Sequence, residues 1–330
     1  MNDDTILDVR NLTVAFDTDE GSLTAVDGVS FQLRRGEILG LVGESGCGKS
    51  VTALSLLRLI PSPPGRIVAG SVHFEGADLL RLPTGKLRQI RGRNISMIFQ
   101  EPMQALSPLH RVGSQLVEAV QLHEPVSDRE AWERSLVWLK KVGIPDAEER
   151  MHIYPFQLSG GMLQRVMIAM ALMLHPSVII ADEPTTALDV TIQAQILELM
   201  QEMRSRDTAV LLITHDLGVV WEMCDRVAVM YASQIVETGT KREVFEKPRH
   251  PYTQALLGSI ISLLGAGERL VPIEGQVPSP LNYPRGCRFA PRCPHAFERC
   301  GNECPGLFDI GAGRQAACFL VDPHAPQEQP

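Results

Sequence analysis

The chain has no long hydrophobic run. Its 330 residues contain no window of roughly 18 uninterrupted apolar residues, the length that a membrane-spanning helix requires. The two longest candidates, residues 255–266 and 166–174, are too short or end at polar residues. The first ten residues are acidic and mixed, without the basic start and apolar core of a signal peptide. We therefore expect a chain that does not span a membrane by itself.

An excess of basic residues is also missing. The chain has 31 Lys and Arg against 39 Asp and Glu, a formal net charge of −8. A broad basic face of the kind that grips nucleic acid is therefore not expected. The charged and hydrophobic fractions, 21% and 44%, are typical of a folded soluble protein, and the length allows one large α/β domain or two ordinary ones.

Cysteine is scarce in most of the chain. Only Cys47 and Cys224 lie in the first 270 residues, while the other five of the seven, and ten of the 23 prolines, lie in the last 60. In a cytosolic, reducing setting, clustered cysteines are metal ligands more often than disulfides. The C-terminal stretch is therefore expected to differ in structure from the rest.

Short apolar runs alternate with helical patterns along the chain. The runs predict strands at 29–33, 38–42, 71–74, 95–100, 178–182, 210–214 and 227–231. The helical patterns lie at 50–59, 114–121, 128–142, 160–174, 192–206 and 252–264. Such alternation predicts a largely parallel α/β domain. Residues 101–157 carry few strand signals and predict a helical insert.

The strongest motif is the run Gly43-Glu-Ser-Gly-Cys-Gly-Lys-Ser50, between a predicted buried strand and a predicted helix. Its glycines let successive backbone N–H groups point at phosphate oxygens, and the start of the following helix adds to the positive field. Lys49 supplies a charge to the outer phosphates, and the Ser50 hydroxyl can bind Mg²⁺. This pattern predicts a nucleotide-phosphate site.

Two further motifs carry phosphate chemistry. The predicted strand 178–182 ends in Asp182 followed by Glu183, a pair suited to holding Mg²⁺ through water and to orienting or deprotonating an attacking water. Leu158-Ser-Gly-Gly-Met162 opens a helix and forms a second anion site. Because one nucleotide needs one such loop, we expect this second helix start to cap a γ-phosphate held by another subunit.

Together these motifs resemble the ATP-binding subunits of ABC transporters, over nearly the whole chain. The resemblance implies an α/β fold of the P-loop NTPase type, with a RecA-like core and a helical subdomain at about 101–175, in an ABC ATPase domain of residues 1–245. It implies ATP and Mg²⁺ as ligands and ATP hydrolysis coupled to transport as the activity. The implied nucleotide-binding residues are Phe16, Gly43, Glu44, Ser45, Gly46, Cys47, Gly48, Lys49, Ser50, Val51, Ser159, Gly160, Gly161 and Asp189.

The resemblance also implies individual roles. Glu183, His215 and Gln100 are the implied catalytic residues, and Ser50, Gln100 and Asp182 are the implied Mg²⁺ ligands. In the family, His215 matches the switch histidine that contacts the γ-phosphate. Asp189 ends the D-loop match Ala187-Leu188-Asp189, and Phe16 is the implied adenine-stacking aromatic.

Segments 99–108, 181–191 and 250–256 and the Cys-rich C-terminus resemble the dipeptide, oligopeptide and nickel importers of this family. That branch implies a heterodimer with a related ATPase, two integral membrane permease subunits that contact the segment Gln100–Val112, an extracytoplasmic substrate-binding protein, and a peripheral location on the cytoplasmic face of the inner membrane. Dipeptides, longer peptides, nickel and glutathione-like compounds all stay open as cargo. Two alternatives share the nucleotide motifs: a soluble non-transport ABC ATPase and a metal-sensing regulatory ATPase.

The C-terminal part, residues 246–330, is expected to be a small Cys-rich extension. Within it, the cysteine segment (residues 287–318) has the spacing Cys287-x5-Cys293-x6-Cys300-x3-Cys304-x13-Cys318. A Pro/Gly-rich segment of this kind does not easily build a core, so a bound metal would supply folding energy. Thiolates can bind Zn²⁺ or an iron–sulfur cluster, and the missing C-x2-C pairs count against zinc; free thiols are the remaining alternative. The family resemblance favours a [4Fe–4S] cluster on Cys287, Cys293, Cys300 and Cys318, with Cys304 unassigned.

Overall fold

The structure, a computed structural model, describes residues 4–185, 188–204, 207–264 and 273–323. Its chain divides into two compact units, each assembled from several stretches of sequence. Unit 1 consists of Met1–Ile6, Leu33–Ile38 and Arg81–Thr214, and unit 2 consists of Leu7–Gln32, Leu39–Leu80 and His215–Pro330.

In the described part of unit 1, parallel strands pair in the order β8-β7-β6. They are β6 (Ile95–Ile98), β7 (Val178–Asp182) and β8 (Ala209–Ile213), and every residue in them is buried. Burial on both faces explains why these strands show no alternation of apolar and polar residues. The register pairs Ile95 with Val178 and Val178 with Ala209, so the carboxyl ends of the strands lie at one edge.

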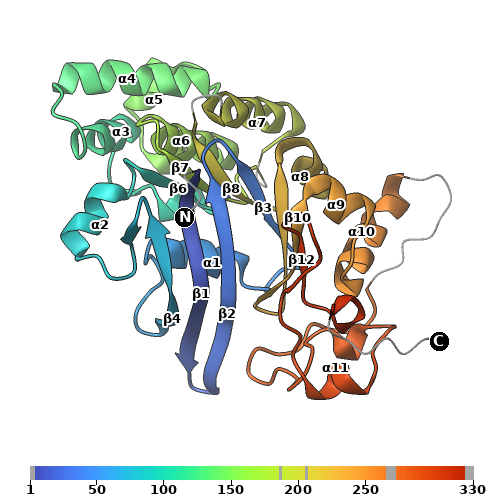
Figure 1. Ribbon diagram of the computed structural model, residues 1–330. Helices are drawn as coiled ribbons and strands as arrows, with labels where there is room; N and C mark the ends of the chain where they lie inside the picture. Colours follow the sequence, from blue (N-terminus) through green and yellow to red (C-terminus); the bar gives the residue numbers. More distant parts are fainter. Residues whose placement is uncertain (1–3, 186–187, 205–206, 265–272, 324–330) are drawn as a thin grey trace. The chain divides into compact units, whose positions relative to one another are not determined.

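The helices of unit 1 form most of its remaining structure. They are α2 (Thr84–Ile90), α3 (Val112–Gln121), α4 (Asp128–Lys141), α5 (Ala147–Met151), α6 (Gly160–Leu172) and α7 (Val190–Arg204). Helices α3, α4, α5 and α6 gather in one group, drawn in green in Figure 1. Ser127 begins α4 by accepting a hydrogen bond from the Glu130 N–H at 3.2 Å. Helices α3, α4 and α5 lie within the predicted helical insert, residues 101–157, and α6 follows it.

Unit 2 has an antiparallel sheet in the order β2-β1-β4-β5. Its strands are β1 (Thr5–Thr18), β2 (Gly21–Arg34), β4 (Gly65–Phe74) and β5 (Ala77–Asp78). The register between β1 and β4 shifts near Thr13, which marks a bulge.

A second set of strands in unit 2 has the order β11-β12-β10-β9-β3. They are β3 (Ile38–Val42), β9 (Arg226–Tyr231), β10 (Gln234–Thr240), β11 (Phe308–Asp309) and β12 (Gln315–Ala316). Strand β3 runs parallel to β9, whereas β12 runs antiparallel to β10, pairing Glu237 with Ala316. The cysteine segment therefore adds two short strands to the edge of a sheet begun by the ATPase part of the chain.

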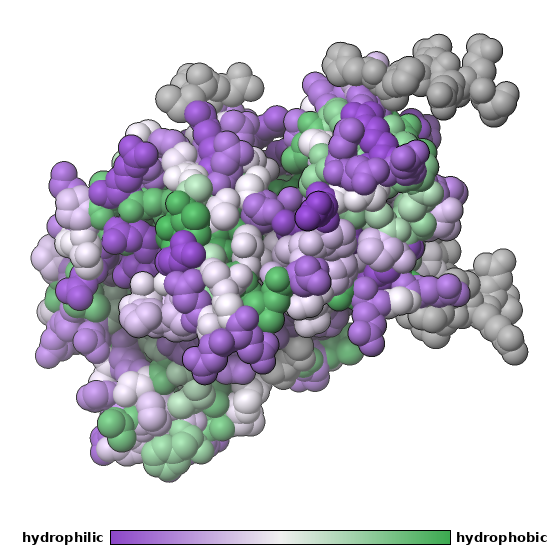
Figure 2. All heavy atoms as spheres, turned by 90° about the horizontal axis from the view of Figure 1, so that it is seen from below, coloured by the Kyte–Doolittle hydropathy of each residue, from purple (hydrophilic) through white to green (hydrophobic). Residues whose placement is uncertain are grey.

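The described residues of unit 2 also form the helices α1 (Lys49–Leu56), α8 (Leu217–Met223), α9 (Lys241–Glu246), α10 (Pro251–Leu264) and α11 (Glu298–Asn302). In Figure 1, α11 and the short 3₁₀ turns of the C-terminal part, in orange and red, lie beside β12 and α10. On the face seen from below, Figure 2 shows small groups of hydrophobic residues separated by hydrophilic ones.

The predicted α/β fold is confirmed by these elements. Strands β3 and β7 have the predicted bounds, and α3, α4 and α6 begin within two residues of the predicted starts. Strands β1 and β10, the helices α2 and α9 and the small strands of the cysteine segment were not predicted. The described helices include none that is long and apolar enough to cross a membrane.

Candidate functional site

The phosphate loop, residues 43–50, lies in unit 2 between β3 and α1. Gly43, Gly46 and Gly48 have φ angles of 154°, 78° and 103°. A Cβ on Gly43 would lie 2.1 Å from the Met230 carbonyl oxygen, and a Cβ on Gly48 would lie 2.2 Å from that of Ala25. Both positions therefore require glycine for the conformation and for the close approach of neighbouring backbone.

Lys49, at the start of α1, turns back over the loop. Its ammonium donates hydrogen bonds to the carbonyl oxygens of Gly43, at 2.7 Å, and Glu44, at 3.0 Å. The side chain is thus held over the concave side of the loop, where a phosphate would offer a stronger acceptor. Cys47 is 1% exposed, and burial raises the pKa of its thiol, so an alkylation-sensitive thiolate is not expected there.

Phe16 and His215 belong to the same unit as the phosphate loop. Phe16 is half-buried on β1, and its ring covers Gly65, its partner in the β1–β4 register. Because Gly65 has no side chain, one face of β4 leaves room for the ring. His215 is exposed and comes just before Asp216, whose carboxylate begins α8 by accepting from the N–H groups of Gly218 and Val219.

Gln100, Asp182 and Glu183 are brought together in unit 1 at the carboxyl ends of β6 and β7. The Gln100 Nε2 donates a hydrogen bond to the Glu183 Oε2 at 3.3 Å. Asp182 is 3% exposed, at the last position of β7. Glu183 has a φ of 47°, a left-handed conformation that is uncommon for Glu, and its N–H donates to the Ile213 carbonyl oxygen at 2.9 Å. The backbone thus fixes this carboxylate at a strained position.

The helix start at Ser159 also lies in unit 1 and faces solvent. The Ser159 side chain caps α6 by accepting from the Met162 N–H at 3.3 Å, and both Ser159 and Gly160 are exposed. An exposed start of a 13-residue helix presents unpaired N–H groups and a positive dipole end. Asp189 begins α7 in a similar way, accepting from the Ile192 N–H at 3.0 Å, while Ala187 of the D-loop match lies outside the described residues.

Gln164 was not predicted from the sequence. It is fully buried in α6, and its Nε2 donates to the Pro184 carbonyl oxygen at 2.9 Å, directly after Glu183. The available signal was a Gln on the buried face of α6, where every other buried residue is apolar. Gln164 therefore helps to hold the strained turn that carries the two acids.

Cys287, Cys293, Cys300 and Cys318 line one enclosed, largely apolar pocket in unit 2, together with His250 and Phe289. Burial, and then the neighbouring Cys287, Cys293 and Cys300, raise the pKa of Cys318 to about 11. Without a bound cation, such a thiol stays protonated at neutral pH. Cys304 is exposed, and its Sγ lies 3.7 Å from the Gln234 Oε1.

The same pocket tests whether these residues fit an iron–sulfur cluster. The four thiols match the cluster in number and kind. The cavity, however, has a volume of about 10 Å³, room for about one water molecule. Among the described residues, no group of three or more His, Cys, Asp or Glu is arranged to hold a metal ion. The donors share one pocket, and a cluster would require that pocket to widen.

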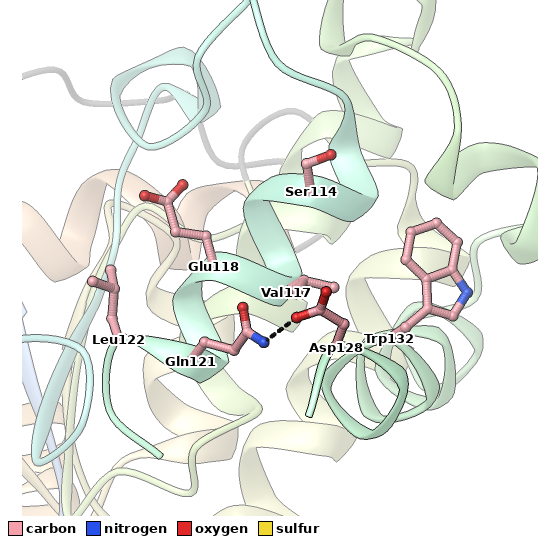
Figure 3. A pocket seen from close by; sticks show the side chains of 7 residues that line it. All are labelled: Ser114, Val117, Glu118, Gln121, Leu122, Asp128 and Trp132. Carbon is pink, nitrogen blue, oxygen red and sulfur yellow. Dashed lines mark hydrogen bonds between the residues drawn. The ribbon is translucent and has the colours of Figure 1, made fainter. Parts of the chain in front are cut away.

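A groove of about 440 Å³ lies on the helical group of unit 1. Figure 3 shows α3 on one side and the start of α4 on the other, with a hydrogen bond of 2.7 Å from the Gln121 Nε2 to the Asp128 Oδ1. Its lining is mixed: Ser114, Val117, Glu118, Gln121, Leu122, Asp128 and Trp132. Leu122 is 71% exposed, and the nearby segment 103–109 exposes Met103 and Leu109. The name α3–α4 groove refers to the seven lining residues alone.

The fold and the two sets of site residues define an ATPase of the P-loop class. A profile described as ABC transporter matches residues 26–186, and one described as Oligopeptide/dipeptide transporter, C-terminal region, matches residues 236–300. The chain belongs to the ABC transporter family of ATP-binding proteins, which hydrolyse ATP to power transport.

Curated relatives match over nearly the full length. The chain is 52% identical to a probable peptide ABC transporter ATP-binding protein of Sinorhizobium fredii, over 96% of this chain and 95% of the relative. It is 50% identical to the dipeptide transport ATP-binding protein DppD of Bacillus subtilis, over 97% and 96%. Among solved structures, the dimeric post-hydrolysis state of the ATP-binding cassette MJ0796, bound to ADP and Pi, has a TM-score of 0.65 and 26% identity, over 72% of this chain and 99% of that one.

Proposed function

We propose that this chain is the ATP-hydrolysing motor subunit of a membrane importer for di- or oligopeptides. The observation that carries the proposal is its similarity to curated peptide-transport ATP-binding proteins, which continues through the oligopeptide/dipeptide-type C-terminal region. In functional terms, residues 1–245 carry the ATP chemistry and residues 246–330 form the Cys-rich extension.

In the proposed mechanism, the phosphate loop binds ATP through backbone N–H groups, Lys49 neutralises the outer phosphates, and Phe16 stacks on adenine. Ser50, Gln100 and Asp182 hold Mg²⁺, which neutralises charge on the phosphates when it is bound. Glu183 orients and deprotonates the attacking water, and His215 contacts the γ-phosphate. The hydrogen bond between Gln100 and Glu183 supports this assignment, because it links the residue assigned to Mg²⁺ with the residue assigned to water.

The exposed start of α6 serves a second subunit in this proposal. Ser159, Gly160 and Gly161 cap the γ-phosphate bound by the partner ATPase, and Asp189 belongs to the same interface. The dimeric form of the related cassette bound to ADP and Pi supports a paired arrangement. We propose a related ATPase as the partner. A Ser159→Arg variant should bind ATP normally while hydrolysis at the partner's site falls; loss of ATP binding at its own site would refute the cross-subunit role.

The α3–α4 groove and the segment 103–109, which exposes Met103 and Leu109, are the proposed contact with the permease subunits. The groove combines the apolar side chains of Val117, Leu122 and Trp132 with the carboxylates of Glu118 and Asp128, so it suits an amphipathic helix that carries a basic residue. The segment follows directly after Gln100, which gives a short route from the ATP chemistry to the membrane subunits. Leu109→Asp and Leu122→Asp should lower co-purification of the permease without changing ATP affinity.

For the Cys-rich extension we propose a [4Fe–4S] cluster bound by Cys287, Cys293, Cys300 and Cys318. Its support is the shared pocket and the matching donor set. The proposed role is structural: Cys287, Cys293, Cys300 and Cys318 would hold the cluster, which would link the segments that carry these thiols. Anaerobic purification tests this, because the absence of absorbance at about 400 nm, of iron and of sulfide would reject the cluster. Zinc without iron would select the alternative metal.

The complete complex would place this chain on the cytoplasmic face of the cell membrane, with two permease subunits and an extracytoplasmic binding protein that selects the cargo. Co-expression with the neighbouring genes and affinity purification test this arrangement. Recovery of two integral membrane subunits, and ATP hydrolysis stimulated by a peptide-loaded binding protein, are the expected results. Stimulation by a nickel-loaded binding protein instead would identify nickel as the cargo. Recovery of DNA or ribosomes without membrane subunits would support a soluble non-transport ATPase.

A further inference from the structure

An ion pair joins the cysteine segment to the phosphate loop. Arg292, the residue before Cys293, donates two hydrogen bonds to the carboxylate of Glu44, the second residue of the phosphate loop. The Nη1–Oε2 distance is 2.8 Å and the Nη2–Oε1 distance is 3.2 Å, so the guanidinium and carboxylate meet fork to fork. The Arg292 side chain is 3% exposed and that of Glu44 is 28% exposed. The phosphate-loop motif does not predict this ion pair, because Arg292 lies far outside the motif in the sequence.

The guanidinium of Arg292 also makes hydrogen bonds to groups other than Glu44. Its Nε donates to the Glu274 carbonyl oxygen at 3.0 Å, its Nη2 to that of Ile273 at 3.2 Å, and its Nη1 to the Tyr231 hydroxyl at 3.4 Å. These bonds fix the orientation of the guanidinium plane. The position of the guanidinium therefore depends on the fold of the C-terminal part. A guanidinium keeps its positive charge at every working pH, and the hydrogen bonds to the Glu44 carboxylate raise the pKa of Arg292 further.

The backbone of the loop is held from the same side. The Glu44 N–H donates to the Tyr252 hydroxyl at 2.9 Å. Tyr252, on α10, packs against Tyr231 and Phe289, with ring centroids 4.5 Å and 5.6 Å away. Phe289 lies within the cysteine segment and lines the cysteine pocket. Side-chain and backbone contacts thus both link the first turn of the phosphate loop to residues around the cysteines.

Charge gives this link a consequence for nucleotide binding. A carboxylate in a loop that must accept several phosphate charges repels the ligand, and the repulsion is strong where water is partly excluded. We propose that Arg292 is a positioning residue for nucleotide binding: it neutralises Glu44, fixes the first turn of the phosphate loop, and so makes nucleotide affinity depend on the cysteine segment. The proposal rests on nucleotide binding by this loop, not on the cargo or on a metal cluster.

Arg299 provides a matched control. Like Arg292 it directly precedes a cysteine of the pocket, Cys300, but it pairs with Glu303 and Asp322, at 2.8 Å and 3.0 Å. Loss of Arg299 therefore removes an arginine from the same segment and leaves the Arg292–Glu44 contact in place.

The test measures the affinity of the full-length chain for Mg-ADP by calorimetry, so that hydrolysis does not intervene. Arg292→Gln should weaken binding about tenfold, whereas Arg299→Gln should stay within about twofold of wild type. In the Glu44→Gln background, adding Arg292→Gln should change the affinity by no more than about twofold, so the tenfold loss caused by Arg292→Gln should be relieved once the carboxylate is absent. This restoration is the signature of neutralisation, because a merely structural loss would persist in the double variant.

Arg292→Lys keeps the positive charge, so it provides a second test if Arg292→Gln does not fold. It should retain affinity within about threefold of wild type, with a melting temperature that confirms folding. Unchanged affinity in Arg292→Gln, an equal loss in the double variant, or an equal loss in Arg292→Lys would overturn the proposal. Because wild-type binding and permease-stimulated hydrolysis are read separately, each of these outcomes leaves the proposed transport function standing.

Discussion

The phosphate loop and the cysteine segment lie in the same compact unit but are shaped by different forces. The loop follows the fully buried strand β3, and its course is set by glycines whose conformations other residues rarely adopt. The cysteine segment has two strands of two residues each and short helical turns. Its position is set by arginines that reach distant parts of the chain: Arg288 to Asp27, Arg292 to Glu44 and Arg314 to Glu237. The loop is thus encoded locally, whereas the segment is encoded by long-range pairs.

The largest expected effect comes from changing the proposed catalytic carboxylate of Glu183, which should abolish hydrolysis without altering the phosphate loop or the cysteine segment. Glu183→Gln should lower the hydrolysis rate by at least about a hundredfold, because it removes the proposed general base. ATP binding should persist, since the phosphate loop is intact, and the nucleotide-bound dimer should accumulate. Single-turnover hydrolysis and gel filtration with ATP measure both effects. Steady turnover in this variant would contradict the assignment of Glu183.

A long-range pair of the cysteine segment gives the next largest expected effect. Glu237 is fully buried and accepts from Arg314 at 2.7 Å and from the N–H groups of Arg249 and His250, each at 2.9 Å. Arg314→Met should lower the free energy of unfolding by about 3–5 kcal/mol, because it leaves a buried carboxylate without its cation. Arg299→Met, at a more exposed pair, should cost about 1 kcal/mol or less. Equal losses in denaturant titrations would show that burial does not distinguish the two pairs.

A change inside the phosphate loop should affect binding more than stability. Lys49→Ala should weaken ATP affinity about 10- to 100-fold, since it removes a charged hydrogen-bond donor from the phosphates. Cys47→Ser is the control, because the backbone rather than this buried side chain faces the ligand. Calorimetry with ATP measures both variants. A larger loss in Cys47→Ser than in Lys49→Ala would reverse the expected ranking.

The smallest expected effect is a difference in thiol reactivity. Burial raises the pKa of Cys224 to about 12, so about one molecule in ten thousand carries the thiolate at about pH 8. Cys304, which is exposed, should react with iodoacetamide first, and Cys47 and Cys224 should be labelled only after unfolding. Peptide mass spectrometry over a time course measures the order. Early labelling of Cys224 would show that the region around β3 opens readily.

The sequence predicts the loop better than the segment for physical reasons. The buried strands β3 and β7 are largely continuous apolar runs, which predict strands directly. The glycine pattern between Gly43 and Gly48 is compatible with few backbone conformations, so it predicts the loop well. Strand β10 was missed because its hairpin turn uses Ala232 and Ser233, with φ angles of 43° and 72°, where Asn-Gly is the usual signal. The contact between Arg292 and Glu44 spans 248 positions, and no local pattern reports it.

The pairing of β12 with β10 has a consequence for the integrity of the chain in solution. Without β12, the outer side of β10 would present unpaired backbone N–H and C=O groups beside Ile235 and Val236, a template for joining another strand. The cysteine segment covers that edge. A chain cut off before Gln315 should therefore form aggregates through strand-to-strand contacts, even where its phosphate loop is intact.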